Sequence, residues 1–227
     1  TGDGLSCDLP AWILKLVQKL KDAFVEAPPP SKKSIMNLFG SVLFGFPQKA
    51  EDYIEDFLLM AFHALENDSN PEVCCGALML IDSCITEHGS IPAEIYDAVV
   101  AAFYHFSRYD VTFEDANTIS NVVTINKGVI SLMTAIYMVS DSDSPFFEKD
   151  AIKKNMDILT KIPVTIVEDS DYFYEISRFY REMVNHPYIK VINIQICGRM
   201  SAYATEMLNY KKSREFGKRI KDYMKNM

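Results

Sequence analysis

Apolar residues recur along most of this chain at the spacing of an α-helix. A clear example is the segment from Pro71 to His88, whose apolar face consists of Val73, Ala77, Leu78, Ile81 and Ile85. Positions three and four residues apart lie on one side of a helix. We expect Gly89 to end this helix, because glycine is favoured just beyond a helix C-terminus. Since no strand–turn–strand pattern stands out, the sequence predicts an all-α fold.

Prolines and polar turns divide the chain at regular intervals. Helices are expected to begin near Ala50, Pro92, Phe146 and Pro187, each followed by a second helix before the next start. The intervals of about 42, 54 and 41 residues are close to the 40–47 residues of HEAT and armadillo helix pairs. The sequence therefore predicts a single α-solenoid of about five HEAT-type antiparallel helix pairs over residues 1–227. Such a solenoid offers a wall of helices to binding partners.

One long helix contains two features that decide its interpretation. We expect Thr112 to cap it, with Glu114 and Asp115 in the first turn, where acidic side chains interact favourably with the helix dipole. The β-branched run at residues 122–125 (VVTI) alone would favour a strand, but the apolar positions around it fit one helix face. Gly128 is expected to weaken or kink this helix.

The motifs of common catalytic and metal sites are missing from the sequence. It contains no phosphate-binding glycine loop, HExxH, GxSxG or calcium-loop pattern. No CxxC motif occurs either, and the five cysteines are Cys7, Cys74, Cys75, Cys84 and Cys197. We expect them to be reduced and to bind no metal. The sequence thus indicates a non-catalytic protein without a cofactor.

The charge of the chain is acidic and uneven. Its net charge is −8, and residues 1–205 carry a balance of −12 because the remaining tail is basic. A nucleic-acid-binding module would be expected to show a basic field, so this balance favours basic proteins as partners. Since no apolar run reaches the roughly 18 residues of a membrane span, we expect no membrane insertion.

Candidate binding residues lie on the polar sides of the second helices. Asp171, Glu175, Arg178 and Glu182 follow helical spacing on one stripe, and earlier helices contribute Asp82, Glu87, Asn117 and Asn121. Carboxylates can bind lysine or arginine, and amides can bind the backbone of an extended peptide. We expect this stripe to be exposed and to hold basic cargo. The alternative is an ordinary solvated helix face.

Three landmarks follow one another in a characteristic order. They are residues 70–73 (NPEV), residues 129–136 (VISLMTAI), and the set formed by residues 162–164 (IPV), 168–169 (ED) and 185–187 (NHP). This order resembles the C-terminal repeats of the importin-beta superfamily, closest to its importin beta-3 branch. The chain departs from the family pattern at Cys74, where arginine is usual, and at residues 127–128 (KG), which replace an acidic–Asn pair.

The resemblance implies a nuclear transport receptor that shuttles between cytoplasm and nucleus. The chain would be a C-terminal fragment of a longer receptor and would bind basic cargo proteins on its inner helices. Ran GTPase would bind the missing N-terminal repeats, and nucleoporins would be further partners.

Two other interpretations stay open at this point. One is a different HEAT or armadillo-type scaffold for protein complex assembly, such as a tubulin-binding array. Such arrays place a tryptophan and basic residues on loops, whereas Trp12 is expected inside a helix. The other is an enzyme on a helical fold, which would need titratable side chains converging in a pocket.

Overall fold

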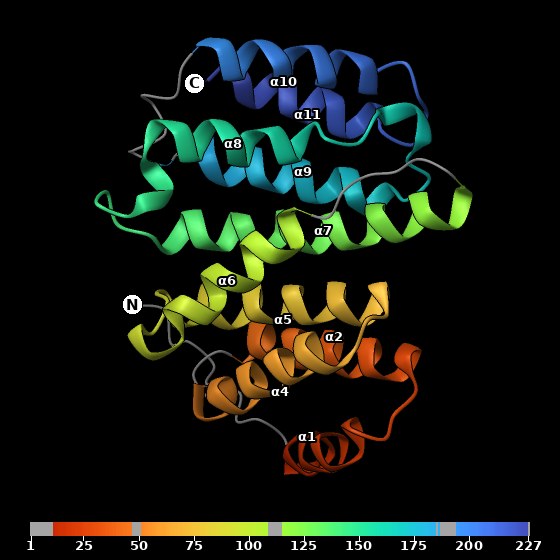
Figure 1. Cartoon of the computed structure of the whole chain (residues 1–227), viewed down its shortest axis with the longest axis vertical. Coiled ribbons are helices and arrows are strands. Elements are labelled where there is room, and N and C mark those ends of the chain that lie inside the picture. The colour runs from red at the N-terminus through yellow and green to blue at the C-terminus, as the bar shows by residue number, and fades with distance from the viewer. Residues whose placement is uncertain (1–10, 47–50, 109–114, 185, 187–193, 227) are drawn as a thin grey trace, which may run out of the picture.

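The computed structural model describes residues 11–46, 51–108, 115–184, 186 and 194–226. Within these ranges the chain forms ten α-helices and several short 3₁₀ helices, and no β-strand occurs there (Figure 1). The prediction of an all-α fold is confirmed.

The helices follow one another along the chain in pairs, and each pair consists of a first helix and a second helix. The first helices are α1 (Ala11–Phe24), α4 (Ile54–Asn67), α6 (Tyr96–Ser107), α8 (Lys149–Leu159) and α10 (Ile194–Met207). The second helices are α2 (Pro29–Gly45), α5 (Pro71–His88), α7 (Ala116–Val139), α9 (Ser170–Val184) and α11 (Arg214–Met224). The 3₁₀ helices η1 (Glu51–Tyr53), η2 (Ala93–Ile95) and η3 (Pro145–Phe147) precede first helices, and η4 (Val164–Ile166) lies between α8 and α9.

The second helices form a continuous row in chain order. Each packs against the next, from α2 through α5, α7 and α9 to α11 (Figure 1). Gly76 of α5 faces Lys33 and Met36 of α2, and Ser83 faces Gly40, so these two helices run in the same direction. Four first helices pack against the second helix that follows them, whereas α8 packs against α7 and η3.

Local sequence explains the ends of α5. The side chain of Asn70 accepts a hydrogen bond from the backbone N–H of Glu72, and Pro71 occupies the first turn, where its missing N–H is not needed. Gly89 ends the helix in the left-handed conformation at φ 77°, which glycine adopts without steric cost. The predicted end at Gly89 is confirmed.

The beginning of α7 differs from the prediction. Asp115 is itself the N-cap residue, and its carboxylate accepts a hydrogen bond from the backbone N–H of Thr118. Thr112 lies outside the described residues. The expectation that Asp115 lies within the first turn is therefore wrong, because the observed cap at Asp115 stands three positions after the expected one at Thr112. A short carboxylate just before the helix accepts from the free N–H groups more directly than one inside it.

Gly128, which was predicted to weaken or kink the helix, lies at a close contact between two helices. The helix α7 is uninterrupted from Ala116 to Val139. A Cβ atom at Gly128 would lie 3.1 Å from both the Cα and the carbonyl oxygen of Cys75 in α5. The missing side chain thus allows two backbones to approach closely in the middle of the row.

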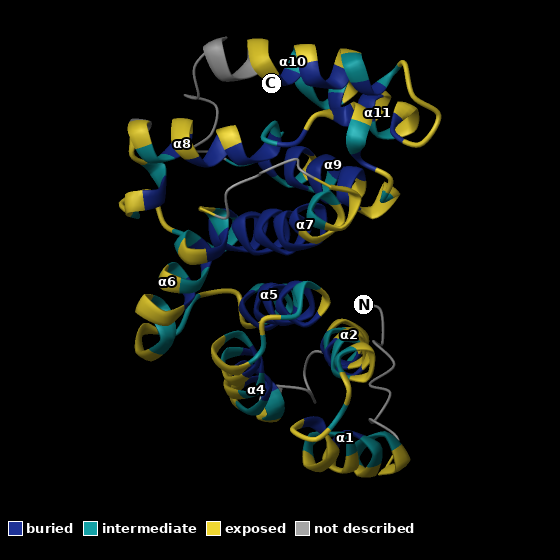
Figure 2. Cartoon of the chain, turned by 45° about the vertical axis from the view of Figure 1, so that its right-hand side comes forward, coloured by how far each residue is buried: buried dark blue, intermediate teal, exposed yellow. Residues whose placement is uncertain are grey.

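The centre of the molecule is α7, which is covered along most of its length (Figure 2). Its length and composition would suit a membrane span, but 89% of the relevant window is buried against the rest of the fold. Several of its buried polar side chains have partners in other segments. Asn126 donates to the hydroxyl of Tyr172 at 3.0 Å, and the ammonium of Lys127 binds Asp169 at 2.6 Å. The helix is therefore a core element of this fold.

Three cysteines are buried and have free thiols. They are Cys74, Cys75 and Cys84, all on α5. Burial raises the pKa of Cys74 to about 11 and that of Cys75 to about 12. Free thiols were predicted at these three positions. A protonated buried thiol is a poor nucleophile, so these residues serve packing.

Candidate binding groove

A groove of about 1010 Å³ follows one face of the row of second helices. Side chains from α2, α5, α7 and α9 line it. Among the predicted binding residues, those that line the groove are Asp82, Glu87, Asp171, Glu175, Arg178 and Glu182. Asn117 and Asn121 are exposed near the start of α7 and lie outside this lining. The structure therefore brings together side chains from the α5 and α9 parts of the predicted set.

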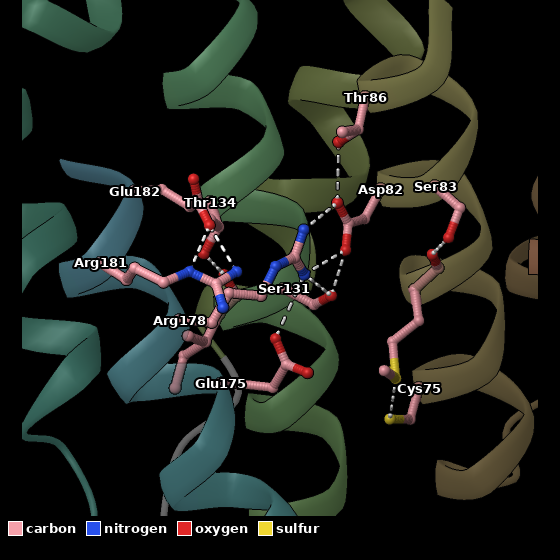
Figure 3. Close-up of polar contacts among 12 residues, drawn as sticks. Cys75, Asp82, Ser83, Thr86, Ser131, Thr134, Glu175, Arg178, Arg181 and Glu182 are labelled. Atoms are coloured by element: carbon pink, nitrogen blue, oxygen red, sulfur yellow. Dashed lines mark hydrogen bonds and ion pairs between the residues drawn. The ribbon is translucent and has the colours of Figure 1, made fainter. Parts of the chain in front are cut away.

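An ion pair joins two helices that are not neighbours in the row. Arg178 of α9 reaches across α7 to Asp82 of α5 (Figure 3). Its Nη1 atom donates to Oδ2 at 2.6 Å and its Nη2 atom donates to Oδ1 at 2.9 Å. This two-point geometry is the strong form of an arginine–carboxylate contact. Burial lowers the pKa of Arg178, but the hydrogen bonds to Asp82 outweigh this effect and raise the pKa above its ordinary value. The guanidinium therefore stays charged.

Hydroxyl groups complete the surroundings of Asp82. Ser131 of α7 donates to Oδ2 at 2.5 Å, and Thr86 donates to Oδ1 at 3.1 Å. Ser131 also accepts from Nη1 of Arg178 at 3.2 Å. A buried carboxylate is costly unless such partners surround it. The small side chain of Ser131 leaves room above α7 for the arginine to cross.

Glu175 lies beside this ion pair in the floor of the groove. It is 4% exposed, and its Oε2 atom accepts from Nη1 of Arg178 at 3.3 Å. Burial raises the pKa of Glu175 to about 7, although the positive charge of Arg178 acts in the opposite direction. An acid with this pKa changes its charge near neutral pH.

The prediction of an exposed stripe is wrong for Asp82 and Glu175. Both side chains are buried, while Asp171 on the same helix as Glu175 is exposed. The reason is that α7 packs against both α5 and α9 and covers one edge of the polar face of each. Helical spacing places a residue on a face, but the neighbouring helix decides how much of that face reaches solvent.

The other charges that line the groove differ in whether they are neutralised. Lys33 pairs with Glu72, and Arg181 pairs with Glu182 at 2.5 Å. Among the residues that the structure describes, Glu87 and Asp171 form no ion pair. The uncompensated charge on this face is therefore negative.

Two aromatic side chains in the groove are exposed. Phe44 near the end of α2 is 82% exposed, and Tyr174 of α9 is 42% exposed. Our sequence analysis missed both as binding residues, together with Lys127 and Ser131. For Phe44 and Tyr174 the available signal was an aromatic residue off the buried face of its helix. Exposed aromatic residues beside uncompensated carboxylates suit recognition of a basic protein segment.

The described part of the chain contains no candidate metal site. No group of three or more histidine, cysteine, aspartate or glutamate side chains lies close enough there to hold a metal ion. A search for similar proteins found no matching family model, curated protein or solved structure. Function must therefore be inferred from the groove itself.

Proposed function

We propose that this chain is a non-catalytic protein-binding module, an α-solenoid of five HEAT-type helix pairs whose groove binds a basic segment of a partner protein. The observation that carries the proposal is the composition of the groove. Its uncompensated charges belong to Glu87 and Asp171, and its exposed apolar surface to Phe44 and Tyr174.

The arrangement of the helices supports the solenoid. The second helices follow one another in a row, and they line one groove from α2 to α9. In helical repeat proteins each unit contacts mainly its neighbours, and the stack forms an extended binding surface. An ion pair from α5 to α9 fixes the position of three successive second helices beneath that surface.

The resemblance to the importin-beta superfamily supports a more specific role. Its landmarks fall between residues 70 and 187, a range that includes three of the four groove helices, α5, α7 and α9. We propose on this basis that the chain belongs to a nuclear transport receptor, with basic import cargo in the groove. Ran GTPase would act through other repeats of the receptor, which would shuttle between cytoplasm and nucleus.

Charge reversal within the groove tests the binding proposal. We expect the double variant Glu87→Lys/Asp171→Lys to bind a labelled arginine-rich peptide about fivefold to twentyfold more weakly in fluorescence anisotropy at low salt, since each exposed ion pair contributes about 0.2–1 kcal/mol. Its affinity should also depend less on salt, because screening has less attraction to remove.

A matched control carries the same change of net charge outside the groove. Glu66 of α4 and Glu94 of η2 are exposed and do not line it. The variant Glu66→Lys/Glu94→Lys should bind the peptide nearly as well as the wild type. Equal weakening in both variants would show that only the overall charge matters, and the groove would then not be the binding site.

The receptor role has its own test. Cargo captured from cell extract by the longer receptor that the resemblance implies should be released by Ran-GTP and retained with Ran-GDP. Cargo that stays bound regardless of Ran would favour a HEAT or armadillo-type scaffold for complex assembly instead.

A further inference from the structure

The carboxylate of Glu175 is only partly satisfied. Asp82 accepts from both terminal nitrogens of Arg178, whereas Glu175 receives one longer contact from Nη1 at 3.3 Å. In the described part of the chain no other residue donates a hydrogen bond to its second oxygen, Oε1. A nearly buried carboxylate normally fills both oxygens with donors. Glu175 thus retains an unused acceptor in the floor of the groove.

The charges around Glu175 do not balance either. Two carboxylates, Asp82 and Glu175, share the single guanidinium of Arg178. The next cation, Lys127 of α7, is bound to Asp169 at 2.6 Å. When both carboxylates are ionised, the cluster carries one more negative charge than positive charges. Since buried charges are stable when paired, a further positive group would be bound favourably there.

Two neighbours of Glu175 extend this feature into the open groove. Asp171 lies one turn before it on α9 and forms no ion pair among the described residues, and Tyr174 exposes part of its ring next to it. All three side chains line the groove. A planar guanidinium can bind carboxylates with several N–H groups and stack on an aromatic ring, which an ammonium does less well.

We propose that Glu175, Asp171 and Tyr174 form a subsite for one arginine side chain of the partner segment. This inference rests on the proposed binding function and specifies its ligand. The guanidinium donates to Oε1 of Glu175 and to Asp171 while its face rests on Tyr174. Arg178 is a positioning residue in this arrangement, because it holds the carboxylate of Glu175 from the side opposite the ligand.

The first test compares peptides and variants. The probe is a fluorescein-labelled peptide with three arginines separated by leucines, and its control carries citrulline, the neutral analogue, in their place. We expect Glu175→Gln to weaken the arginine peptide about tenfold and to leave the citrulline peptide unchanged. The amide can still accept from Arg178, so the fold should persist. Glu66→Gln, outside the groove, serves as the control variant.

The second test uses pH. The titratable and charged groups around Glu175 are Asp82 and Cys75 on α5, Lys127 on α7, and Arg178 and Asp171 on α9. Because an arginine ligand favours the ionised carboxylate, and burial raises the pKa of Glu175 to about 7, binding should strengthen with pH. We expect affinity for the arginine peptide to be about tenfold higher at pH 8 than at pH 6. This difference should disappear in Glu175→Gln and persist in Asp171→Asn.

The possible results separate this inference from the proposed function. Arginine-dependent binding that is unaffected by Glu175→Gln would overturn the subsite and leave the groove as a binding site. Equal binding of the arginine and citrulline peptides would also overturn it. If neither the arginine peptide nor the control peptide binds at any pH, both proposals are wrong.

Discussion

Helices α7 and α1 differ strongly in how many of their residues are buried. In α7, 16 of 24 residues are buried, including Asn126, Lys127 and Ser131. In α1, only Val17 and Phe24 of 14 residues are buried, and Trp12 is 65% exposed. Helix α7 has neighbours on several sides, whereas α1 packs mainly on α2 (Figure 2).

This difference shows what burial on several sides requires. Each polar side chain of a covered helix needs a partner, since an unsatisfied buried group costs about 1–3 kcal/mol. The structure supplies such partners to α7 from distant segments, including Asp82 for Ser131 and Asp169 for Lys127. A helix such as α1 can leave its polar face to water. Substitutions should therefore be far more costly around α7 than on α1.

The largest expected effect comes from removing Arg178. We expect Arg178→Met to lower the free energy of unfolding by about 3–5 kcal/mol, because it leaves Asp82 buried without its cation. Arg181 is the matched control, since it pairs with Glu182 at the surface, and Arg181→Met should change stability by less than about 0.5 kcal/mol. Urea denaturation followed by circular dichroism measures both. Similar costs would show that the bridge across α7 is not special.

Overpacking at Gly128 should have the next largest effect. Valine there would press against the backbone of Cys75 and should lower stability by about 3 kcal/mol. Gly198 of α10 offers the contrast, because space around it is open. Gly198→Ala should raise stability by about 0.5–1 kcal/mol through helix propensity. Thermal unfolding compares the two, and a stable Gly128→Val variant would contradict the close approach of α5 and α7.

The buried acid beside α7 predicts a pH dependence with a definite sign. Burial raises the pKa of Glu175 to about 7 from an ordinary value of about 4.5. The folded state then holds a proton that the unfolded state releases, so this residue makes stability fall as pH rises from about 4.5 to 7 and adds no further loss above that range.

Replacing Glu175 by glutamine should remove this loss. The stability of Glu175→Gln relative to the wild type should therefore rise by about 2–3 kcal/mol between pH 4.5 and pH 7.5. Urea denaturation at several pH values measures the difference. Parallel pH profiles for the two proteins would show that the carboxylate titrates normally.

The smallest effects are expected on α1. Trp12→Ala should change stability by less than about 0.5 kcal/mol, because the side chain is mostly in water. Val17→Ala removes a buried side chain and should cost about 1 kcal/mol. Amide hydrogen exchange should show faster exchange confined to α1 in the second variant. Loss of protection in α7 as well would mean that the two regions unfold together.

The sequence by itself determined the helical units and several of their ends. The spacing of apolar residues defined the buried face of α5, and Asn70, Pro71 and Gly89 defined its ends through local hydrogen bonding and backbone preference. Such features depend on residues a few positions apart. The same local spacing placed Asp171, Glu175, Arg178 and Glu182 on one helix stripe, and all four line the groove.

Only the tertiary structure decided which polar residues are covered and which are free. Arg178 and Asp82 are 96 positions apart in the chain, and Ser131 of a third helix forms hydrogen bonds with both. The same packing buries Glu175, leaves Asp171 exposed and brings Gly128 against Cys75. Helical periodicity assigns a side chain to a face, but the distance and orientation of neighbouring helices determine whether that face meets water, an ion pair or another backbone.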